Sequence, residues 1–443
     1  MGIILSSHIA KVCVIGIWHL GSVVSACLAD AGYLVIGVDR DHEKVDKLNQ
    51  GIAPLYEPGL DQLLRRNVEL KRLGFTTDLK SAVKNVRYVF ITFDTPVDAR
   101  DEVDISEVFD TCRDLAEDLE NDSIIVVSSQ VPVGTCDEIK SAIRERNRSL
   151  EFDVAYSPEN LRLGQAIECF RNPDRIVIGA DRDSTLDRVE QLFSVIPAPK
   201  LRMGLRSAEM TKHALNTFLA TSISFINEIA NICDEVGADA MEVSEGLSTD
   251  QRIGKKAPLH PGLGFSGGHL ARDLKVLKGL GGKFGYETHL IDGVLKVNEE
   301  QTKSVVRKLE RILGSLRGLS IGVLGLTYKP DTSTLHRSAA LEIIRDLVDK
   351  GAVVKAHDPK AALEEIQLHK EFKFCKDPYE VAEGGDALVV ITEWPEYREL
   401  DFGLLRTKMK RPILFDAKNM LDDKLLTEKG FKYFGIGRGR ANE

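Results

Sequence analysis

The residues whose types and spacing best suit ligand chemistry lie near the start of the chain. Gly16 and Gly21 bound the segment GIWHLG, which follows an apolar run and precedes a helical pattern. This is a Gly-x-x-x-x-Gly form of the dinucleotide-binding loop, whose outer glycines allow a tight turn and close helix–strand packing. Trp18 stands where a middle glycine normally lets the backbone approach the pyrophosphate, so its side chain must turn away. The loop predicts a dinucleotide site, with an ordinary glycine-rich turn as the alternative.

An acidic residue follows this loop at the position that discriminates between nicotinamide cofactors. Asp39 ends the second apolar run, LVIGVD. A carboxylate there can accept hydrogen bonds from both ribose hydroxyls and repels a 2′-phosphate, which favours NAD over NADP. Arg40, the next residue, is the one feature that favours NADP.

These residues need a sheet to position them, and the first 200 residues predict one. Short β-branched runs alternate with helical patterns, as in a parallel, doubly wound sheet. The predicted strands are Lys11–Gly16, Leu34–Asp39, Tyr88–Thr92, Ile124–Ser128 and Ile176–Gly179, and Gly21–Ala31 is a predicted helix.

The pattern changes at about Ser207. Residues 207–235 contain no Pro or Gly and carry apolar residues at helical spacing, which predicts one long helix and a plausible dimer surface. A second alternating segment follows: strands at 320–326, 352–357, 387–392 and 413–416, and a helix at 339–350. We therefore predict an α/β protein with two Rossmann-like, doubly wound domains (1–206 and 316–443) joined by a long central helix and a helical middle domain (207–315). Residues 435–443 are predicted to be a frayed tail.

Composition excludes several classes of protein. With 443 residues, a 43% hydrophobic fraction and a net charge of −9, the chain is a globular protein of about three domains. The acidic balance argues against a nucleic-acid surface, which needs a basic face. No apolar run is long enough to span a membrane, and no signal peptide is evident.

The seven cysteines form no CxxC pair, and no HxxxH pattern occurs. Scattered cysteines indicate buried thiols in a reducing compartment, so we expect a cytoplasmic protein. No metal site is predicted.

A set of short motifs extends along almost the whole chain. They are Thr95-Pro96, SQVPVGT at 129–135, SPENL at 157–161, NPDR at 172–175, AEMTK at 208–212, PGLGFSGGHLARD at 261–273, YKPDT at 328–332, HDP at 357–359 and TEW at 392–394. In order and spacing the chain resembles the UDP-glucose/GDP-mannose dehydrogenase family. The resemblance implies an NAD-dependent enzyme that removes hydride twice from C6 of a nucleotide-activated sugar, and it implies a homodimer or higher homo-oligomer.

The chain departs from this family at the residue that performs the second oxidation. The family motif GFGGxCxxKD reads GFSGGHLARD here, so His269 occupies the position of the nucleophilic cysteine. Imidazole cannot replace a thiolate in a durable thioester-like intermediate. His269 could act as a general base that hydrates the aldehyde, or the enzyme could stop after one hydride. Ser266 in the same segment is better explained as a small residue in a glycine-rich turn than as a nucleophile.

The resemblance assigns further catalytic roles. Lys212 and Asn216, four residues apart on one helical face, would polarise a carbonyl and stabilise an alkoxide. Asp273 would orient a water or act as a base, with a helix N-cap as the alternative. Glu159 would face the reacting carbon, with a surface loop as the alternative. For Lys212 and Asn216 the alternatives are a solvated lysine and an asparagine on the helix surface.

The resemblance also assigns binding residues. Gly16, Trp18, Gly21, Asp39, Lys44, Thr95 and Gln130 would bind the cofactor, and Arg252, Phe265, Lys329 and Arg398 the substrate, with Arg252 reaching a neighbouring subunit's site. The positively charged arginine and lysine side chains are suited to bind a diphosphate through charge-assisted hydrogen bonds. Four family positions differ here: Leu163 replaces an acid, Gln130 a threonine, and Thr334 and His336 an acid and an arginine near the cofactor. Leu163 and Gln130, together with His269, suggest altered chemistry or an altered sugar, whereas Thr334 and His336, together with Trp18, suggest a weakened or reshaped NAD site.

Two other hypotheses are kept. The Lys-x-x-x-Asn pair also occurs in β-hydroxyacid dehydrogenases, although the C-terminal α/β domain speaks against that class. A catalytically silent homologue that binds a nucleotide sugar and NAD is the third. The particular nucleotide and sugar are not evident from the sequence.

Overall fold

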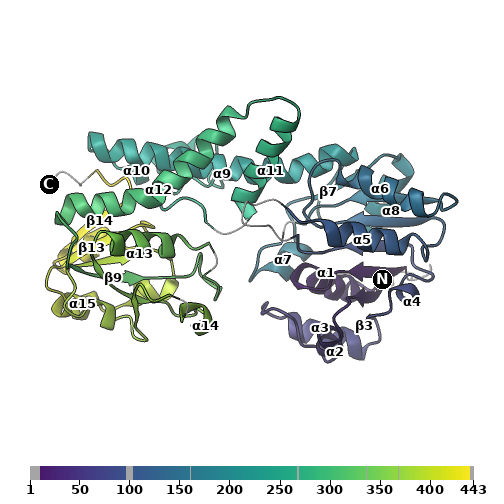
Figure 1. Cartoon of the computed structure of the whole chain (residues 1–443), viewed down its shortest axis with the longest axis horizontal. Helices are drawn as coiled ribbons and strands as arrows, with labels where there is room; N and C mark the ends of the chain where they lie inside the picture. The colour runs from purple at the N-terminus through teal and green to yellow at the C-terminus, as the bar shows by residue number, and fades with distance from the viewer. Residues whose placement is uncertain are drawn as a thin grey trace, which may run out of the picture. The chain divides into compact units, whose positions relative to one another are not determined.

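The computed structural model describes residues 10–95, 103–159, 161–266, 269–335, 337–367 and 369–439. These residues form two compact units, 1–214 and 215–443. Each unit contains one twisted sheet with helices on its two faces (Figure 1). The α/β class predicted from the alternating pattern is confirmed.

The sheet of the first unit has eight strands in the order β3-β2-β1-β4-β5-β6-β7-β8. The strands are β1 (Lys11–Ile15), β2 (Leu34–Val38), β3 (Leu73–Thr76), β4 (Tyr88–Ile91), β5 (Ser123–Val127), β6 (Phe152–Tyr156), β7 (Ile176–Ala180) and β8 (Lys200–Met203). Every predicted strand is present within two residues of its predicted end. The order reverses direction between β1 and β4, which makes the carboxyl ends of these strands a ligand-binding edge.

One strand pair departs from the parallel arrangement that the pattern predicts. β7 runs antiparallel to β6, with Tyr156 opposite Gly179. The connection between them contains only the six-residue helix α7 (Ala166–Arg171). Six helical residues advance about 9 Å, less than the roughly 17 Å of a five-residue strand, so this helix cannot return the chain along the sheet.

Helices cover both faces of this sheet. The apolar cluster on one face includes residues of α1 (His19–Asp30), α2 (His42–Asn49), α3 (Leu60–Glu69), α7 and α8 (Asp183–Leu192). The other face packs against α4 (Leu79–Ala82), α5 (Ser106–Leu115) and α6 (Thr135–Arg146). The 3-10 helix η1 is Phe193–Val195. Helices on both faces explain why the central strands β4 and β5 are buried along their whole length.

The long helix predicted from residue 207 is confirmed as α9 (Leu205–Val236), which continues from the first unit into the second. Three more helices follow it: α10 (Ala240–Thr249), α11 (His269–Lys283) and α12 (His289–Leu313). Within the described residues, no helix combines the length and the apolar character that crossing a membrane requires.

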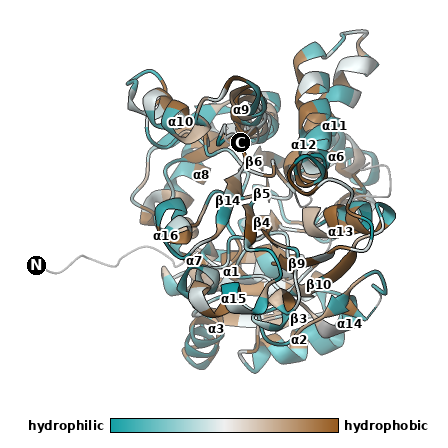
Figure 2. Cartoon of the chain, turned by 90° about the vertical axis from the view of Figure 1, so that its left-hand side faces the viewer, coloured by the Kyte–Doolittle hydropathy of each residue, from teal (hydrophilic) through white to brown (hydrophobic). Residues whose placement is uncertain are grey.

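The second unit contains a six-stranded parallel sheet in the order β11-β10-β9-β12-β13-β14. Its strands are β9 (Ser320–Leu324), β10 (Val353–His357), β11 (Lys373–Phe374), β12 (Ala387–Val390), β13 (Ile413–Asp416) and β14 (Lys432–Gly435). Its helices are α13 (Ala339–Asp349), α14 (Leu363–Ile366), α15 (Phe402–Lys408) and α16 (Asp423–Glu428), with 3-10 helices η2 (Glu380–Ala382) and η3 (Pro395–Glu399). In Figure 2 the strands are mostly hydrophobic, whereas outer helices such as α2 and α3 are largely hydrophilic.

The end of the chain corrects the prediction of a frayed tail. Ile436 is fully buried in the core of the second unit. The amide of Gly437 donates to the Asp234 carboxylate on α9 at 3.1 Å, and Gly439 donates to the same carboxylate at 3.3 Å. A buried carboxylate therefore anchors residues 436–439, and residues 440–443 lie outside the described part of the chain.

Candidate active site

The dinucleotide loop needs glycine at both of its ends. Gly16 has a φ of +89°, and a Cβ there would lie 2.9 Å from the backbone nitrogen of Phe93. A Cβ on Gly21 would overlap the carbonyl oxygen of Gly16 and approach Thr92 Oγ1 to 2.7 Å. The first glycine therefore makes the turn, and the second lets α1 pack closely against β1 and β4.

Asp39 lies at the carboxyl end of β2, next to this loop. Its Oδ2 accepts from Lys44 Nζ at 2.8 Å, and its Oδ1 accepts from the Asp41 amide at 3.1 Å. Arg40, the residue that favoured NADP, is exposed and pairs with Asp114 at 2.9 Å. Each carboxylate oxygen has two acceptor sites, so Asp39 keeps capacity for ribose hydroxyls.

Thr95 and Gln130 meet at the neighbouring strand ends. Thr95 Oγ1 donates to the Gln130 carbonyl oxygen at 2.8 Å, and both residues are buried. The segment after Gln130 is held by the first turns of α9, because Glu209 accepts from the amides of Gly134 at 2.6 Å and Cys136 at 2.8 Å. Sequence reasoning missed Glu209, since only its full burial shows that the carboxylate binds these amides.

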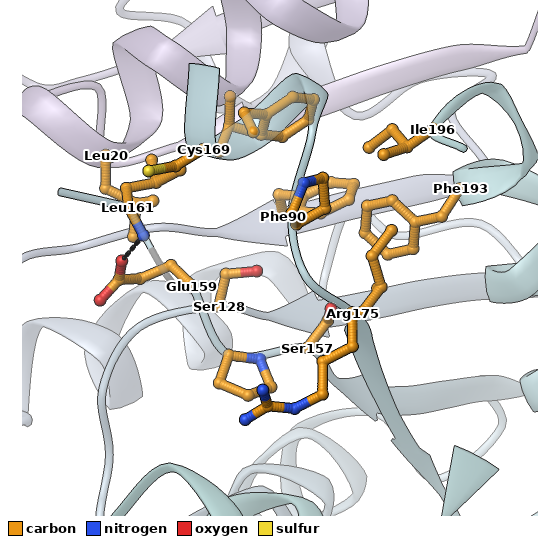
Figure 3. A pocket seen from close by; sticks show the side chains of 15 residues that line it. Leu20, Phe90, Ser128, Ser157, Glu159, Leu161, Cys169, Arg175, Phe193 and Ile196 are labelled. Carbon is orange, nitrogen blue, oxygen red and sulfur yellow. Dashed lines mark hydrogen bonds between the residues drawn. The ribbon is translucent and has the colours of Figure 1, made fainter. Parts of the chain in front are cut away.

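Buried Lys212 pairs with the partly buried Glu159 within the first unit. Lys212 Nζ donates to the Glu159 carbonyl oxygen at 2.6 Å and to Oε1 at 3.1 Å. Glu159 Oε2 accepts from the Leu161 amide at 2.7 Å (Figure 3). The alternative of a solvated lysine is wrong, because Lys212 is 7% exposed.

Asn216 and Asp273 form the matching pair within the second unit. Asn216 Nδ2 donates to Asp273 Oδ2. Asp273 is fully buried in the body of α11, so the alternative of a helix N-cap is wrong. His269 is the first residue of α11, one turn before Asp273, and its side chain lies outside the described part of the structure, as does all of His336. Lys212 and Asn216 are one turn apart on α9, and each bonds a carboxylate from a different segment.

A second carboxylate network joins the dinucleotide loop to the loop that carries Glu159. Buried Glu57 bonds His19 Nε2 at 3.0 Å and accepts from the amides of Gly164 and Ala166, both at 2.8 Å. Sequence reasoning missed Glu57. The adjacent Pro58 and Gly59 indicate a turn. The residues that bond the Glu57 carboxylate are up to 109 positions away in the sequence, so local pattern could not identify them.

A cavity of about 70 Å³ lies under the Glu159 loop in the first unit. Its wall is mostly apolar, and Figure 3 shows Phe90, Phe193 and Ile196 around it with Ser128, Ser157 and Cys169. Cys169 is the partly exposed cysteine, whereas the other six are buried. Burial raises the pKa of Cys13, Cys27 and Cys112 to about 12, so these thiols stay neutral and unreactive.

The predicted substrate residues of the second unit differ in exposure. Arg252 is exposed and forms a two-pronged pair with Asp250, at 3.0 and 2.6 Å. Lys329 lies over the Tyr328 ring at 5.7 Å, and Arg398 is exposed on η3. The Phe265 side chain is buried in an apolar cluster with Ala220, Leu274 and Val294, and its backbone amide and carbonyl bond the Asn298 side chain at 2.8 and 3.0 Å.

The HDP and TEW motifs have a structural role in this unit. Asp358 Oδ2 accepts from the amides of Leu326 and Thr327, at 2.8 and 3.0 Å, and from Trp394 Nε1 at 3.1 Å. Asp358 is 4% exposed. This carboxylate therefore shapes the turn after β9 that leads to Lys329.

Comparison with known proteins settles the family. Three models of the UDP-glucose/GDP-mannose dehydrogenase family match the chain: the NAD binding domain at 10–196, the central domain at 206–300 and the UDP binding domain at 322–423. The chain belongs to this family. It is accordingly an NAD-dependent oxidoreductase that acts on the CH–OH group of a nucleotide sugar.

Relatives within the family match over nearly their full length. UDP-glucose 6-dehydrogenase of Rhizobium meliloti is 39% identical over 97% of this chain and 99% of its own. UDP-glucose 6-dehydrogenase TuaD of Bacillus subtilis is 38% identical over 97% and 93%. The structure of a UDP-glucose dehydrogenase from Pyrobaculum islandicum superposes with a TM-score of 0.89 at 33% identity, covering 99% of this chain and 100% of that one.

The dehydrogenase's own residues fit NAD. A Cβ at Gly16 or Gly21 would clash with neighbouring protein atoms, so the turn keeps the tight backbone of a dinucleotide loop, and Asp39 presents a carboxylate at the adjacent strand end. When bound, NAD supplies the hydride acceptor. The β-hydroxyacid dehydrogenase hypothesis is not supported, because the family's UDP binding domain matches residues 322–423.

Proposed function

We propose that this dehydrogenase oxidises C6 of a UDP-activated hexose, with UDP-glucose as the first candidate. The relatives named above carry that activity in their names. The observation that supports it within the chain is the pair on α9: a buried ammonium, Lys212, and an amide, Asn216, one turn apart, each bonded to a carboxylate.

In the first oxidation the C6 hydroxyl loses a proton and C6 loses a hydride. Lys212 and Asn216 stabilise the negative charge that develops on the oxygen, since preorganised donors in a site that excludes water act strongly on developing charge. Asp273 takes the proton or orients the water that takes it, and Glu159 faces the reacting carbon. The product is an aldehyde.

The second oxidation requires a route without the family's cysteine. We propose that water adds to the aldehyde and that His269 removes a proton from this water as general base, which forms a gem-diol. Loss of a second hydride and a proton from the gem-diol yields the carboxylic acid. A general base contributes about 10²- to 10⁴-fold to such a step.

The stoichiometry of NADH tests this route. With limiting UDP-glucose we expect two NADH per sugar from the wild type and one from His269→Ala, because the hydration step slows most. The matched control is His289→Ala, which replaces the exposed first residue of the next helix and should leave two NADH.

Three results would contradict parts of the proposal. One NADH per sugar from the wild type would mean that the enzyme stops at the aldehyde. A fall to one NADH in Cys169→Ser, with His269→Ala unchanged, would replace hydration by a thiol route. No NADH from UDP-, GDP- or dTDP-sugars would leave a silent binding protein.

For the nucleotide we propose Arg252, Lys329 and Arg398 as ligands of the diphosphate or sugar, with Phe265 contributing the second acceptor site of its carbonyl oxygen beside Asn298. Exposure of Arg252 and Arg398 supports this assignment. We likewise propose functional domains at 1–206, 207–315 and 316–443 for NAD, dimerisation and the nucleotide sugar.

We propose that α9 forms a homodimer with a second copy of itself. Phe218, Phe225 and Ile232 recur every seven residues along the helix and are 64%, 47% and 53% exposed. A seven-residue repeat places them on one stripe, and an isologous contact pairs that stripe with its copy. Large exposed apolar stripes mark such interfaces.

Adding charge to this stripe should dissociate the dimer. We expect Phe218→Glu/Phe225→Glu to elute as a monomer in size-exclusion chromatography with light scattering, because four carboxylates would face one another. Phe284→Glu, at an aromatic residue that is 76% exposed and lies outside the stripe, should remain dimeric. A monomeric wild type, or a dimeric double variant, would refute this interface.

A further inference from the structure

The dinucleotide loop carries an exposed side chain, Trp18, that the proposed chemistry does not use. Its φ is −71°, so the loop does not need the left-handed conformation that favours glycine at this position. The indole is 42% exposed, although tryptophan is ordinarily well buried. Its ring nitrogen makes no hydrogen bond to the described residues. The exposed face of the indole is therefore available to a ligand.

One cation links this indole to the carboxylate that receives the ribose. Lys44 Nζ lies 5.7 Å from the centroid of the Trp18 ring and 2.8 Å from Asp39 Oδ2. Strands β1 and β2 are adjacent and parallel, with Ile15 opposite Val38, so the residues after them lie at the same edge. The Trp18 indole, the Lys44 ammonium and the Asp39 carboxylate therefore border one area between the dinucleotide loop and the end of β2.

In a doubly wound fold the adenosine half of the dinucleotide occupies this area, with its ribose at the acidic residue and its phosphates at the start of α1. An aromatic ring at its border offers a flat apolar surface to the ribose and adenine. Stacking of bases on aromatic side chains tolerates different geometries and contributes substantially to binding.

We propose that the indole of Trp18, held by Lys44, forms a wall that packs against the adenosine half of NAD. The family's loop achieves contact through a bare glycine backbone, whereas this chain adds an aromatic surface. Affinity for the adenosine half should therefore depend on an aromatic ring at position 18.

Calorimetry with ADP-ribose, which contains the adenosine half without nicotinamide, measures this dependence directly. We expect Trp18→Ala to bind ADP-ribose and NAD about tenfold more weakly than the wild type, and Trp18→Phe to stay within about threefold. Phe284→Ala, which truncates an exposed aromatic residue in the second unit, should bind as the wild type does.

Fluorescence gives a second readout on the unaltered protein. The chain has two tryptophans, and Trp394 is 2% exposed in the second unit. The emission of the wild type minus that of Trp18→Phe therefore reports Trp18. We expect saturating ADP-ribose to quench this difference signal. Unchanged emission, or equal affinity of Trp18→Ala and the wild type for ADP-ribose, would overturn the proposal.

Discussion

Replacing Lys212 with alanine should lower the turnover number by about a hundred- to a thousandfold while NAD still binds with nearly wild-type affinity. The ammonium is 7% exposed and directed by the Glu159 carbonyl and carboxylate oxygens, so it is fixed before the reaction begins. Removing one preorganised donor from a developing oxyanion typically has an effect of this size. The measurements are steady-state kinetics with UDP-glucose and calorimetry with NAD.

Lys80→Ala is the matched control for this variant. Lys80 lies in the same unit and also forms an ion pair, with Asp118 at 3.1 Å, but its side chain is 69% exposed. It should turn over as the wild type does. A Lys212→Ala enzyme with normal turnover would remove the α9 pair from the mechanism and with it the central support for the proposed chemistry.

The second large effect concerns stability. Lys308→Met should reduce the free energy of unfolding of the second unit by about 3–5 kcal/mol. Lys308 on α12 donates to Asp234 on α9, and both side chains are almost completely buried. Burial lowers the pKa of Lys308, an effect that the Asp234 carboxylate opposes. Methionine keeps the volume but leaves a buried carboxylate without its cation. Urea unfolding followed by circular dichroism measures the change.

The chain provides a close comparison one turn further along α12. Arg311 pairs with Glu235, but their side chains are 54% and 60% exposed. Arg311→Met should therefore reduce the free energy of unfolding of the second unit by no more than about 1 kcal/mol. In the double variant Lys308→Met/Asp234→Leu only part of the lost stability should return: neither charge is then buried alone, but the amides of Gly437 and Gly439 lose their acceptor. Equal losses from Lys308→Met and Arg311→Met would contradict the role of burial.

Much of the fold could be predicted from local pattern. Buried parallel strands are continuous apolar runs, so the predicted strands from β1 to β13 appear within two residues of their predicted ends. α9 extends the predicted 207–235 by a few residues because no glycine or proline interrupts it. Gly16 and Gly21 could be identified because their roles depend on backbone geometry within one turn.

Polar partners could not be predicted in this way. The structure pairs Asp273 with Asn216, Glu57 with residues 164 and 166, and Asp234 with Lys308 and residues 437 and 439. These contacts join residues that are far apart in the sequence. The local sequence around a charged residue does not show whether its side chain is solvated or buried. The frayed-tail prediction failed for this reason.

What the sequence by itself determined was the α/β class, the family and the NAD cofactor, since these depend on residue types at short spacing and on the order of short motifs. Only the tertiary structure decided the antiparallel direction of β7, the burial of Lys212 and Asp273, and the carboxylates that hold the loops. The physical reason is that a side chain's charge, solvation and partner are set by which distant segments fold against it.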